Sequence, residues 1–383
     1  MQQVSEGNLS FDIDKLWSDL QTKVDHMIVQ IGDKSPHVAR GDGIYDNNPT
    51  DAWTSGFWPG MLWIMYDMTG KEHYKQAAWH WDRTIEEHFV KPSNLYHDVG
   101  FQFLPTAVIK YKLTGDADAR RIGLEAANFL AGRFNLAGNF IRAWNTIPGA
   151  WHEGNTGWAI IDCMMNLPLL FWASEELKDP RFKHIAMAHA ETALKHFIRE
   201  DGSSCHICCF DPETGEFIRE IGGQGYAAGS AWSRGTGWAL YGFSAMYRIT
   251  GQIRFLEAAK RVAHFFMANL EEDNIPLWDF RVDDREEAPR DTSAAALAAS
   301  GLIDISKHVP AAQSKLYINK AKEILQSLAH NYSTWDQPDH QAILIQGTGH
   351  KPLGSNINVS LIYGDYYYVE AIAKLIGWNK NMF

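Results

Sequence analysis

One stretch of the sequence decides the fold: Ala159-Ile-Ile-Asp-Cys-Met-Met-Asn-Leu-Pro-Leu-Leu-Phe-Trp172, followed by the turn Lys178-Asp-Pro180 and a second segment. The first part is apolar nearly all round, as a helix enclosed by other helices must be. After the turn, apolar residues recur at helical spacing, at Phe182, Ile185, Ala186, Ala193 and Phe197, which indicates a helix with one buried face. The stretch is therefore predicted to be a hairpin of one inner and one outer helix.

The same hairpin recurs along the chain, with turns at Thr69-Gly, Thr114-Gly and Thr250-Gly. The predicted inner helices are 54–68, 101–113, 156–174, 233–249, 292–307 and 361–375, and the predicted outer helices are 11–31, 72–89, 117–133, 180–199, 253–270 and 313–331. Six inner and six outer helices predict an all-α fold, an (α/α)6 barrel that forms a single domain over residues 1–383. An open solenoid is the alternative, disfavoured because the hairpins differ in length and the loops are long.

The composition excludes several classes of protein. With 383 residues, 45% of them apolar, the chain is typical of globular proteins, and its net charge of -11 comes from scattered acids without a basic stripe for nucleic acid. Asp162 and Glu175 interrupt the best candidate for a membrane span, so no membrane partner is expected. Residues 1–10 lack the pattern of a signal peptide, which predicts a cytoplasmic protein, or a periplasmic one if a signal was trimmed. No pattern indicates an oligomeric state.

The four cysteines are too few and too clustered for a disulfide framework, so reduced thiols are expected; they are Cys163, Cys205, Cys208 and Cys209. A metal site at Cys205-His-Ile-Cys-Cys209 would need a second pair of ligands at zinc spacing, which the sequence does not supply. We therefore expect packed thiols and no metal.

Asp162 is the residue that most needs an explanation, because it lies in the middle of the most apolar stretch. A carboxylate there loses hydration, so its pKa should rise unless a cation or several donors hold the charge. A raised carboxyl pKa is what a general acid needs near neutrality. The alternative is a structural aspartate, hydrogen-bonded to backbone or paired with an arginine. A second acid among aromatic residues, Asp98, and a load of fifteen tryptophans favour sugar chemistry.

The loops that lead into the inner helices of such a toroid gather at one end and carry the unusual residues. They include Asp51 to Trp58, His97-Asp98, Trp144, Trp151-His-Glu153, Gly223-Gln-Gly225, Ser230 to Trp238 and Gly364 to Tyr368. Irregular segments rich in Trp, His, Gln and Arg around one mouth predict a binding site.

At these motifs the chain resembles the unsaturated glucuronyl hydrolases of glycoside hydrolase family 88. The resemblance runs over almost the whole length, through Trp53-Thr-Ser-Gly-Phe-Trp58, His97-Asp-Val-Gly100, Arg142-Ala-Trp144, Ile160-Ile-Asp-Cys163, Phe210-Asp-Pro-Glu-Thr-Gly215, Trp232-Ser-Arg-Gly235, Pro289-Arg-Asp-Thr-Ser293 and Gly364-Asp-Tyr-Tyr-Tyr368. It implies hydrolysis of oligosaccharides that carry a terminal 4-deoxy-hexenuronic acid left by a polysaccharide lyase, without a metal or organic cofactor. The implied reaction hydrates the C4–C5 double bond, after which the hemiketal opens and expels the aglycone.

The resemblance also implies roles for individual residues. Asp162 matches the general acid/base and Asp98 the second essential carboxylate. Residues expected around the sugar are Trp53, His97, Trp144, His206, Gln224, Arg234, Trp238 and His350, with the tryptophans as stacking faces. From the residues alone, a core or surface histidine is the favoured interpretation of His206, and Gln224 could be part of a plain turn. Arg234 could be the partner of the substrate carboxylate or of a structural acid.

Two departures concern the substrate. Gly349 precedes His350 where relatives often carry an aromatic residue, and the loop around Lys351 lacks the Ser/Ser/Lys cluster of the streptococcal members that prefer sulfated disaccharides. The segment from Trp144 to Asn155 also looks longer than usual, which could remodel the aglycone side. The alternatives are an unsaturated rhamnogalacturonyl hydrolase of family 105, acting on pectin fragments, and a toroid that binds or isomerises sugars without hydrolysis.

Overall fold

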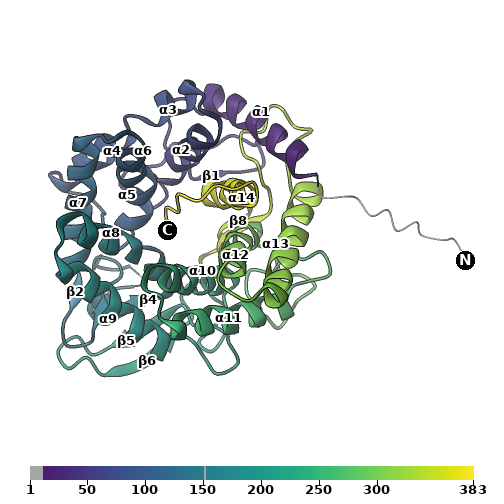
Figure 1. Ribbon diagram of the computed structural model, residues 1–383. Coiled ribbons are helices and arrows are strands. Elements are labelled where there is room, and N and C mark those ends of the chain that lie inside the picture. Colours follow the sequence, from purple (N-terminus) through teal and green to yellow (C-terminus); the bar gives the residue numbers. More distant parts are fainter. Residues whose placement is uncertain (1–11, 151) are drawn as a thin grey trace, which may run out of the picture.

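The computed structural model describes residues 12–150 and 152–383, so Trp151 and the N-terminal segment considered for a signal peptide lie outside the described residues. Figure 1 shows a closed ring of helices, seen end-on, with inner helices surrounded by outer ones. The inner helices are α2 (Phe57–Thr69), the segment α5 (Val99–Phe103) to α6 (Ile109–Thr114), α8 (Leu167–Leu177), α10 (Ser233–Thr250), α12 (Thr292–Ser306) and α14 (Ile362–Leu375). The predicted (α/α)6 barrel is confirmed.

The outer helices bury one face each, as their spacing predicts. They are α1 (Ile13–Ile31), α3 (Glu72–Ala78) with α4 (Trp81–Glu86), α7 (Ala117–Ala131), α9 (Pro180–His196), α11 (Ile253–Ala268) and α13 (Ala311–Asn331). By contrast, every residue of the inner helix α12 is buried. Helix α1 lies between α3 and α13 and closes the ring (Figure 1), and the Gln30 side chain donates to the Pro338 carbonyl at 3.0 Å.

Two inner segments depart from the prediction of a continuous helix. Residues 101–113 contain a π-helical turn over Leu104–Val108, because Pro105 has no N–H for the helical ladder and its ring crowds the preceding turn. The helix predicted over 156–174 begins only at Leu167. Before it, Trp158–Ile160 form strand β4 and Ile161–Met165 a 3-10 turn, so the prediction that Asp162 lies within a regular helix is wrong.

Short antiparallel strands cover the end of the barrel where the loops gather. They form three sheets: β1 (Val38–Ala39), β8 (Ser355–Leu361) and β7 (Gly347–His350); β2 (Phe134–Asn135) and β3 (Phe140–Ile141); and β4, β5 (Ile207–Phe210) and β6 (Phe217–Ile221). Val38 pairs with Leu361, so the first and last strands of the chain meet here. Within the described ranges, no helix has both the length and the apolar composition that a membrane span requires.

Candidate active site

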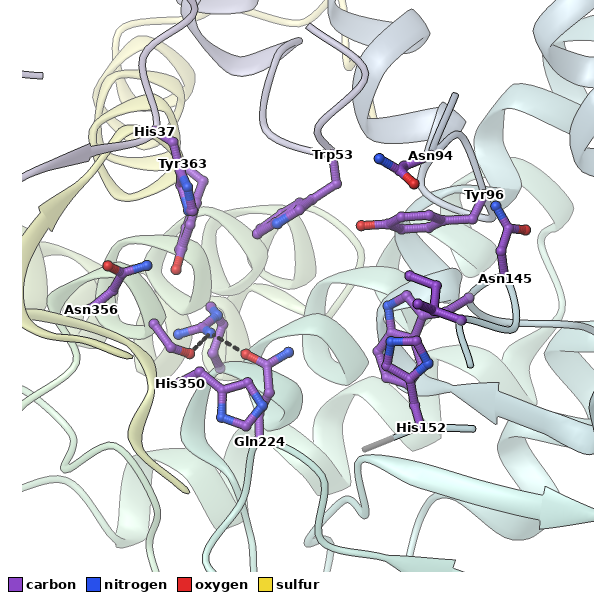
Figure 2. A pocket seen from close by; sticks show the side chains of 14 residues that line it. His37, Trp53, Asn94, Tyr96, Asn145, His152, Gln224, His350, Asn356 and Tyr363 are labelled. Carbon is purple, nitrogen blue, oxygen red and sulfur yellow. Dashed lines mark hydrogen bonds between the residues drawn. The ribbon is translucent and has the colours of Figure 1, made fainter. Parts of the chain in front are cut away.

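A cavity of about 410 Å³ opens at the end of the barrel where the inner helices begin. Two groups of side chains face each other across it, with Trp53 between them (Figure 2). Its lining consists of His37, Trp53, Asn94, Tyr96, Trp144, Asn145, Ile147, His152, Gln224, Arg234, Gly349, His350, Asn356 and Tyr363. The structure therefore brings together five of the predicted site residues: Trp53, Trp144, Gln224, Arg234 and His350.

Asp162 lies behind this lining, on the 3-10 turn that follows β4. It is within electrostatic range of Tyr96, Arg234 and Tyr363, three of the residues that line the cavity. Burial raises the pKa of Asp162 to about 7, although the charge of Arg234 opposes the shift. Its carboxyl group is thus poised to exchange a proton near neutrality.

Asp98 is the residue immediately before α5 and is also buried. Burial raises the pKa of Asp98 well above its usual range, and the charge of Asp162 adds to the effect. The Asn166 amide opposes the shift by donating to Asp98 Oδ1 at 3.3 Å. Burial and the charge of Asp162 both disfavour a second negative charge here, so the two carboxyl groups do not ionise independently.

Two predicted histidines lie beside the carboxyl groups as neutral rings. His206 Nδ1 accepts from the backbone N–H of Gln224 at 2.9 Å, which assigns the ring proton to Nε2, 3.6 Å from Asp162 Oδ2. Burial lowers the pKa of His206 to about 3 and that of His97 well below its usual range. His97 Nε2 lies 3.1 Å from Asp98 Oδ1 without the alignment of a hydrogen bond.

Arg234 is held by four contacts from its two terminal nitrogens. Nη1 donates to Asp291 Oδ2 at 2.7 Å and to the Thr348 carbonyl at 2.6 Å, while Nη2 donates to Gln224 Oε1 at 2.9 Å and to the Gly349 carbonyl at 2.7 Å. The structural ion pair considered from the sequence is thus present, with Asp291. All four terminal N–H donors are engaged, so a substrate carboxylate has to use Nε–H or displace the side chain of Gln224.

The three predicted stacking tryptophans do not lie in equivalent places. Trp53 and Trp144 line the cavity, and the Trp144 ring stacks on His152 with 5.7 Å between centroids. Trp238 is fully buried, with its ring centroid 5.1 Å from that of Phe101, so the prediction that it offers a stacking face is wrong. Trp238 is the fourth residue after Arg234, on the same face of α10, which places it one turn deeper in the core.

The prediction for the Gly364 to Tyr368 segment is also wrong, because Asp365 and Tyr366–Tyr368 are buried and none of them lines the cavity. Asp365 accepts hydrogen bonds from the Tyr45 hydroxyl and from the backbone N–H groups of Ile343 and Leu344. The neighbouring Tyr363 lines the cavity instead.

Seven lining residues were not predicted individually: His37, Asn94, Tyr96, Asn145, Ile147, Asn356 and Tyr363. Gly349, noted in the sequence beside His350, also lines the cavity. Tyr96 directly precedes the predicted His97-Asp98 pair, so its place in the chain was a usable signal. Asn94 and Asn145 lie in loops, and Asn356 near the start of β8, in sequences that carry no spacing that points to a site.

The cysteines pack as thiols. Cys205 Sγ and Cys208 Sγ lie 3.4 Å apart, and all four cysteines are buried. In the part of the chain that the structure describes, no three His, Cys, Asp or Glu side chains converge in a way that could hold a metal ion.

Comparison with known proteins assigns the family. Residues 26–383 match the model of Glycosyl Hydrolase Family 88. The chain is 37% identical over 349 residues to an unsaturated glucuronyl hydrolase of Bacillus sp. (strain GL1), covering 90% of this chain and 92% of the relative. It is 32% identical over 371 residues to an unsaturated chondroitin disaccharide hydrolase of Streptococcus pneumoniae, covering 96% of this chain and 92% of the relative.

A solved structure agrees with these matches. The crystal structure of the unsaturated glucuronyl hydrolase from Bacillus sp. GL1, described as responsible for the degradation of glycosaminoglycan, superposes with a TM-score of 0.90 at 35% identity, covering 95% of this chain and 96% of that one. The family predicted from the motifs is confirmed by both kinds of match, and with it the prediction of a glycosidase. This chain belongs to Glycosyl Hydrolase Family 88.

Proposed function

We propose that this chain removes the terminal 4-deoxy-hexenuronic acid from short oligosaccharides produced by a polysaccharide lyase, glycosaminoglycan fragments among them. The names of its relatives support this class of substrate. The observation that carries the proposal is Asp162, a buried carboxyl group with a pKa of about 7 beside a fixed cation, Arg234. A group of this kind can give up a proton and take one back at neutral pH.

In the proposed reaction, Asp162 donates its proton to C4 of the unsaturated sugar, and the ring oxygen stabilises the positive charge that develops at C5. Water then attacks C5 and returns a proton to Asp162, so the group begins and ends in the same state. The hemiketal formed at C5 opens to a ketone, and the hemiacetal at C1 releases the aglycone as an alcohol. No net charge is left on the enzyme.

The surrounding residues have distinct parts in this proposal. The raised pKa of Asp98 favours its neutral form, which can hydrogen-bond to a sugar hydroxyl without adding a second charge near Asp162. His206 presents Nε2–H toward Asp162 and can hold the attacking water. Trp53 and Trp144 offer aromatic faces to the sugar rings, and Arg234 favours the substrate carboxylate electrostatically.

The function is tested by the loss of the ultraviolet absorbance of the conjugated enol-carboxylate. Purified protein is mixed with unsaturated disaccharides from chondroitin, heparin and rhamnogalacturonan, and the rates are compared. We expect decay with glycosaminoglycan disaccharides. Decay with the rhamnogalacturonan disaccharide alone would favour the pectin-directed alternative, and tight binding of every disaccharide without decay would favour a sugar-binding toroid.

The pH dependence follows from the raised pKa of Asp162. Because the folded protein holds this proton up to about pH 7, the acid form dominates on the mildly acidic side and is lost above neutrality. We expect kcat/KM to fall by about tenfold per pH unit once the pH exceeds the pKa of Asp162. A profile measured from pH 5 to 9 checks this, and activity that rises steadily above neutrality would contradict the role of Asp162 as acid.

A further inference from the structure

Asn166 lies where the two segments that carry the acids meet. It directly precedes α8, and no part of it is exposed to solvent. Its side-chain oxygen accepts from the backbone N–H of Phe101 at 2.9 Å. Because a backbone N–H can only donate, this bond fixes the orientation of the amide and turns its NH₂ group the other way.

That NH₂ group contacts both acidic residues. It donates to Asp98 Oδ1 at 3.3 Å and to the backbone carbonyl of Asp162 at 3.4 Å. One side chain thus bridges the start of α5, the 3-10 turn of Asp162 and the start of α8. Its own backbone N–H donates to the Cys163 carbonyl at 2.9 Å, so Asn166 is fixed within the same turn as Asp162.

Gly100 shows how closely these segments approach. A Cβ atom at this position would lie 2.4 Å from Asn166 Oδ1 and 2.6 Å from Asn166 Cα. Only glycine lets the first turn of α5 rest directly on Asn166. The glycine of the His97-Asp-Val-Gly motif is therefore explained by Asn166 and not by contact with the cavity.

We propose that Asn166 is a positioning residue, which sets the separation and orientation of the Asp98 and Asp162 carboxyl groups for the reaction. The inference rests on the proposed function. By donating to Oδ1, Asn166 fixes which oxygen of Asp98 accepts from it, so the carboxyl group keeps one rotamer and one hydrogen-bonding pattern. Through the carbonyl of Asp162, the same amide holds the turn that carries the general acid.

The test is a double-mutant cycle between Asn166→Leu and Asp98→Asn, read by kcat and KM on an unsaturated chondroitin disaccharide. Leucine has a similar size but makes none of the three hydrogen bonds. We expect Asn166→Leu to lower kcat by roughly 10- to 100-fold with KM within a factor of about 3, because the acids are misplaced rather than removed. When Asn166→Leu is added to the Asp98→Asn variant, the fold-decrease in kcat should be less than a third of that seen in the wild type, because part of the effect of Asn166 acts through Asp98.

A matched control is Asn155→Leu, because Asn155 is equally buried and its amide bonds to Arg142 and to the Asn145 carbonyl, not to either acid. Its effect should be the same with and without Asp98→Asn. If the fold-effects of Asn166→Leu and Asp98→Asn on kcat simply multiply in the double variant, as expected for the Asn155→Leu control, the positioning role is overturned.

A second variant, Asn166→Asp, is used in case Asn166→Leu does not fold. It keeps a side-chain oxygen that can accept from the backbone N–H of Phe101. It replaces the donor by a group that can ionise near Asp162, and a nearby negative charge raises the pKa of a carboxyl group. We expect the alkaline limb of the pH profile to move up by about one unit. An unchanged profile with an unchanged kcat would contradict the proposal.

The thermal stability of the wild type, Asn166→Leu, Asp98→Asn and their double variant separates this inference from the proposed function. Asn166 and Asp98 should be coupled in Tm whether or not the protein turns over any disaccharide. Coupling in Tm without turnover by the wild type would contradict the proposed function while supporting the contact between Asn166 and Asp98. Turnover by the wild type without coupling in either Tm or kcat would contradict the positioning role alone.

Discussion

Replacement of Asp162 by asparagine is expected to lower kcat by about 10³-fold or more while substrate binding persists, because one group supplies both proton transfers of the proposed reaction. The amide has the same shape but has no acidic proton to give to C4. The measurement is ultraviolet decay under single-turnover conditions, with binding followed separately by calorimetry. Near-normal turnover of the variant would remove Asp162 from the mechanism.

Thermal stability provides the control for this variant. The pKa of Asp162 is about 7 in the folded protein, above the ordinary value of about 4 in an unfolded chain, so the folded state binds the proton more tightly. The contribution of this group to stability is therefore fully present below pH 4 and is lost as the pH rises toward 7, by an amount on the order of 4 kcal/mol. The asparagine variant avoids this loss and should have a Tm at pH 8 no lower than that of the wild type.

Replacement of Arg234 by methionine is expected to reduce the free energy of unfolding by about 3–5 kcal/mol, because it leaves the fully buried carboxylate of Asp291 without its cation. Denaturant unfolding measures the loss. Pairing Arg234→Met with Asp291→Asn should restore part of it, and an additive double variant would show that the ion pair does not stabilise the fold.

Arg234→Lys separates the structural part of this residue from its effect on substrate. Lysine keeps a positive charge near Asp291 but offers a point charge with fewer fixed donors, so it cannot hold Gln224 and the Gly349 carbonyl together. We expect a folded protein whose kcat/KM falls by about 100-fold, mainly through KM. A kcat that falls while KM stays constant would mean that Arg234 acts on Asp162 and not on the bound carboxylate.

Sequence reasoning succeeded where the signal is local. The 3.6-residue period placed α12 and α14 within a residue or two of their observed bounds. This works because the apolar pattern of a helix buried on all sides or on one face is visible within a short window of sequence. It failed for residues 156–166. There the apolar run is also compatible with a strand, and the partner that decides the matter, β5, lies about 50 residues further along the chain.

The site was predictable in part for the same reason. Asp162 and Asp98 stand out because a carboxyl group among apolar residues needs an explanation in any fold. Trp53 lies just before the predicted inner helix 54–68 and lines the cavity, whereas Trp238 lies inside the predicted inner helix 233–249 and is buried in the core. The position of each tryptophan relative to its helix is the signal that separates them. Asn166 was overlooked because it falls inside the helix predicted over 156–174, and the break before Leu167 depends on the distant pairing of β4 with β5.

The pairing of β1 with β8 bears on the order in which the protein acquires its activity. His37 directly precedes β1 and Tyr363 follows β8, so this wall of the cavity joins the two extremes of the sequence. Contacts between residues so far apart in the sequence cost more loop-closure entropy than contacts within one hairpin, so we expect them to form after the hairpins. A chain still emerging from the ribosome can assemble hairpin after hairpin, but it has no catalytic chamber until the last inner helix has been synthesised and the ring has shut.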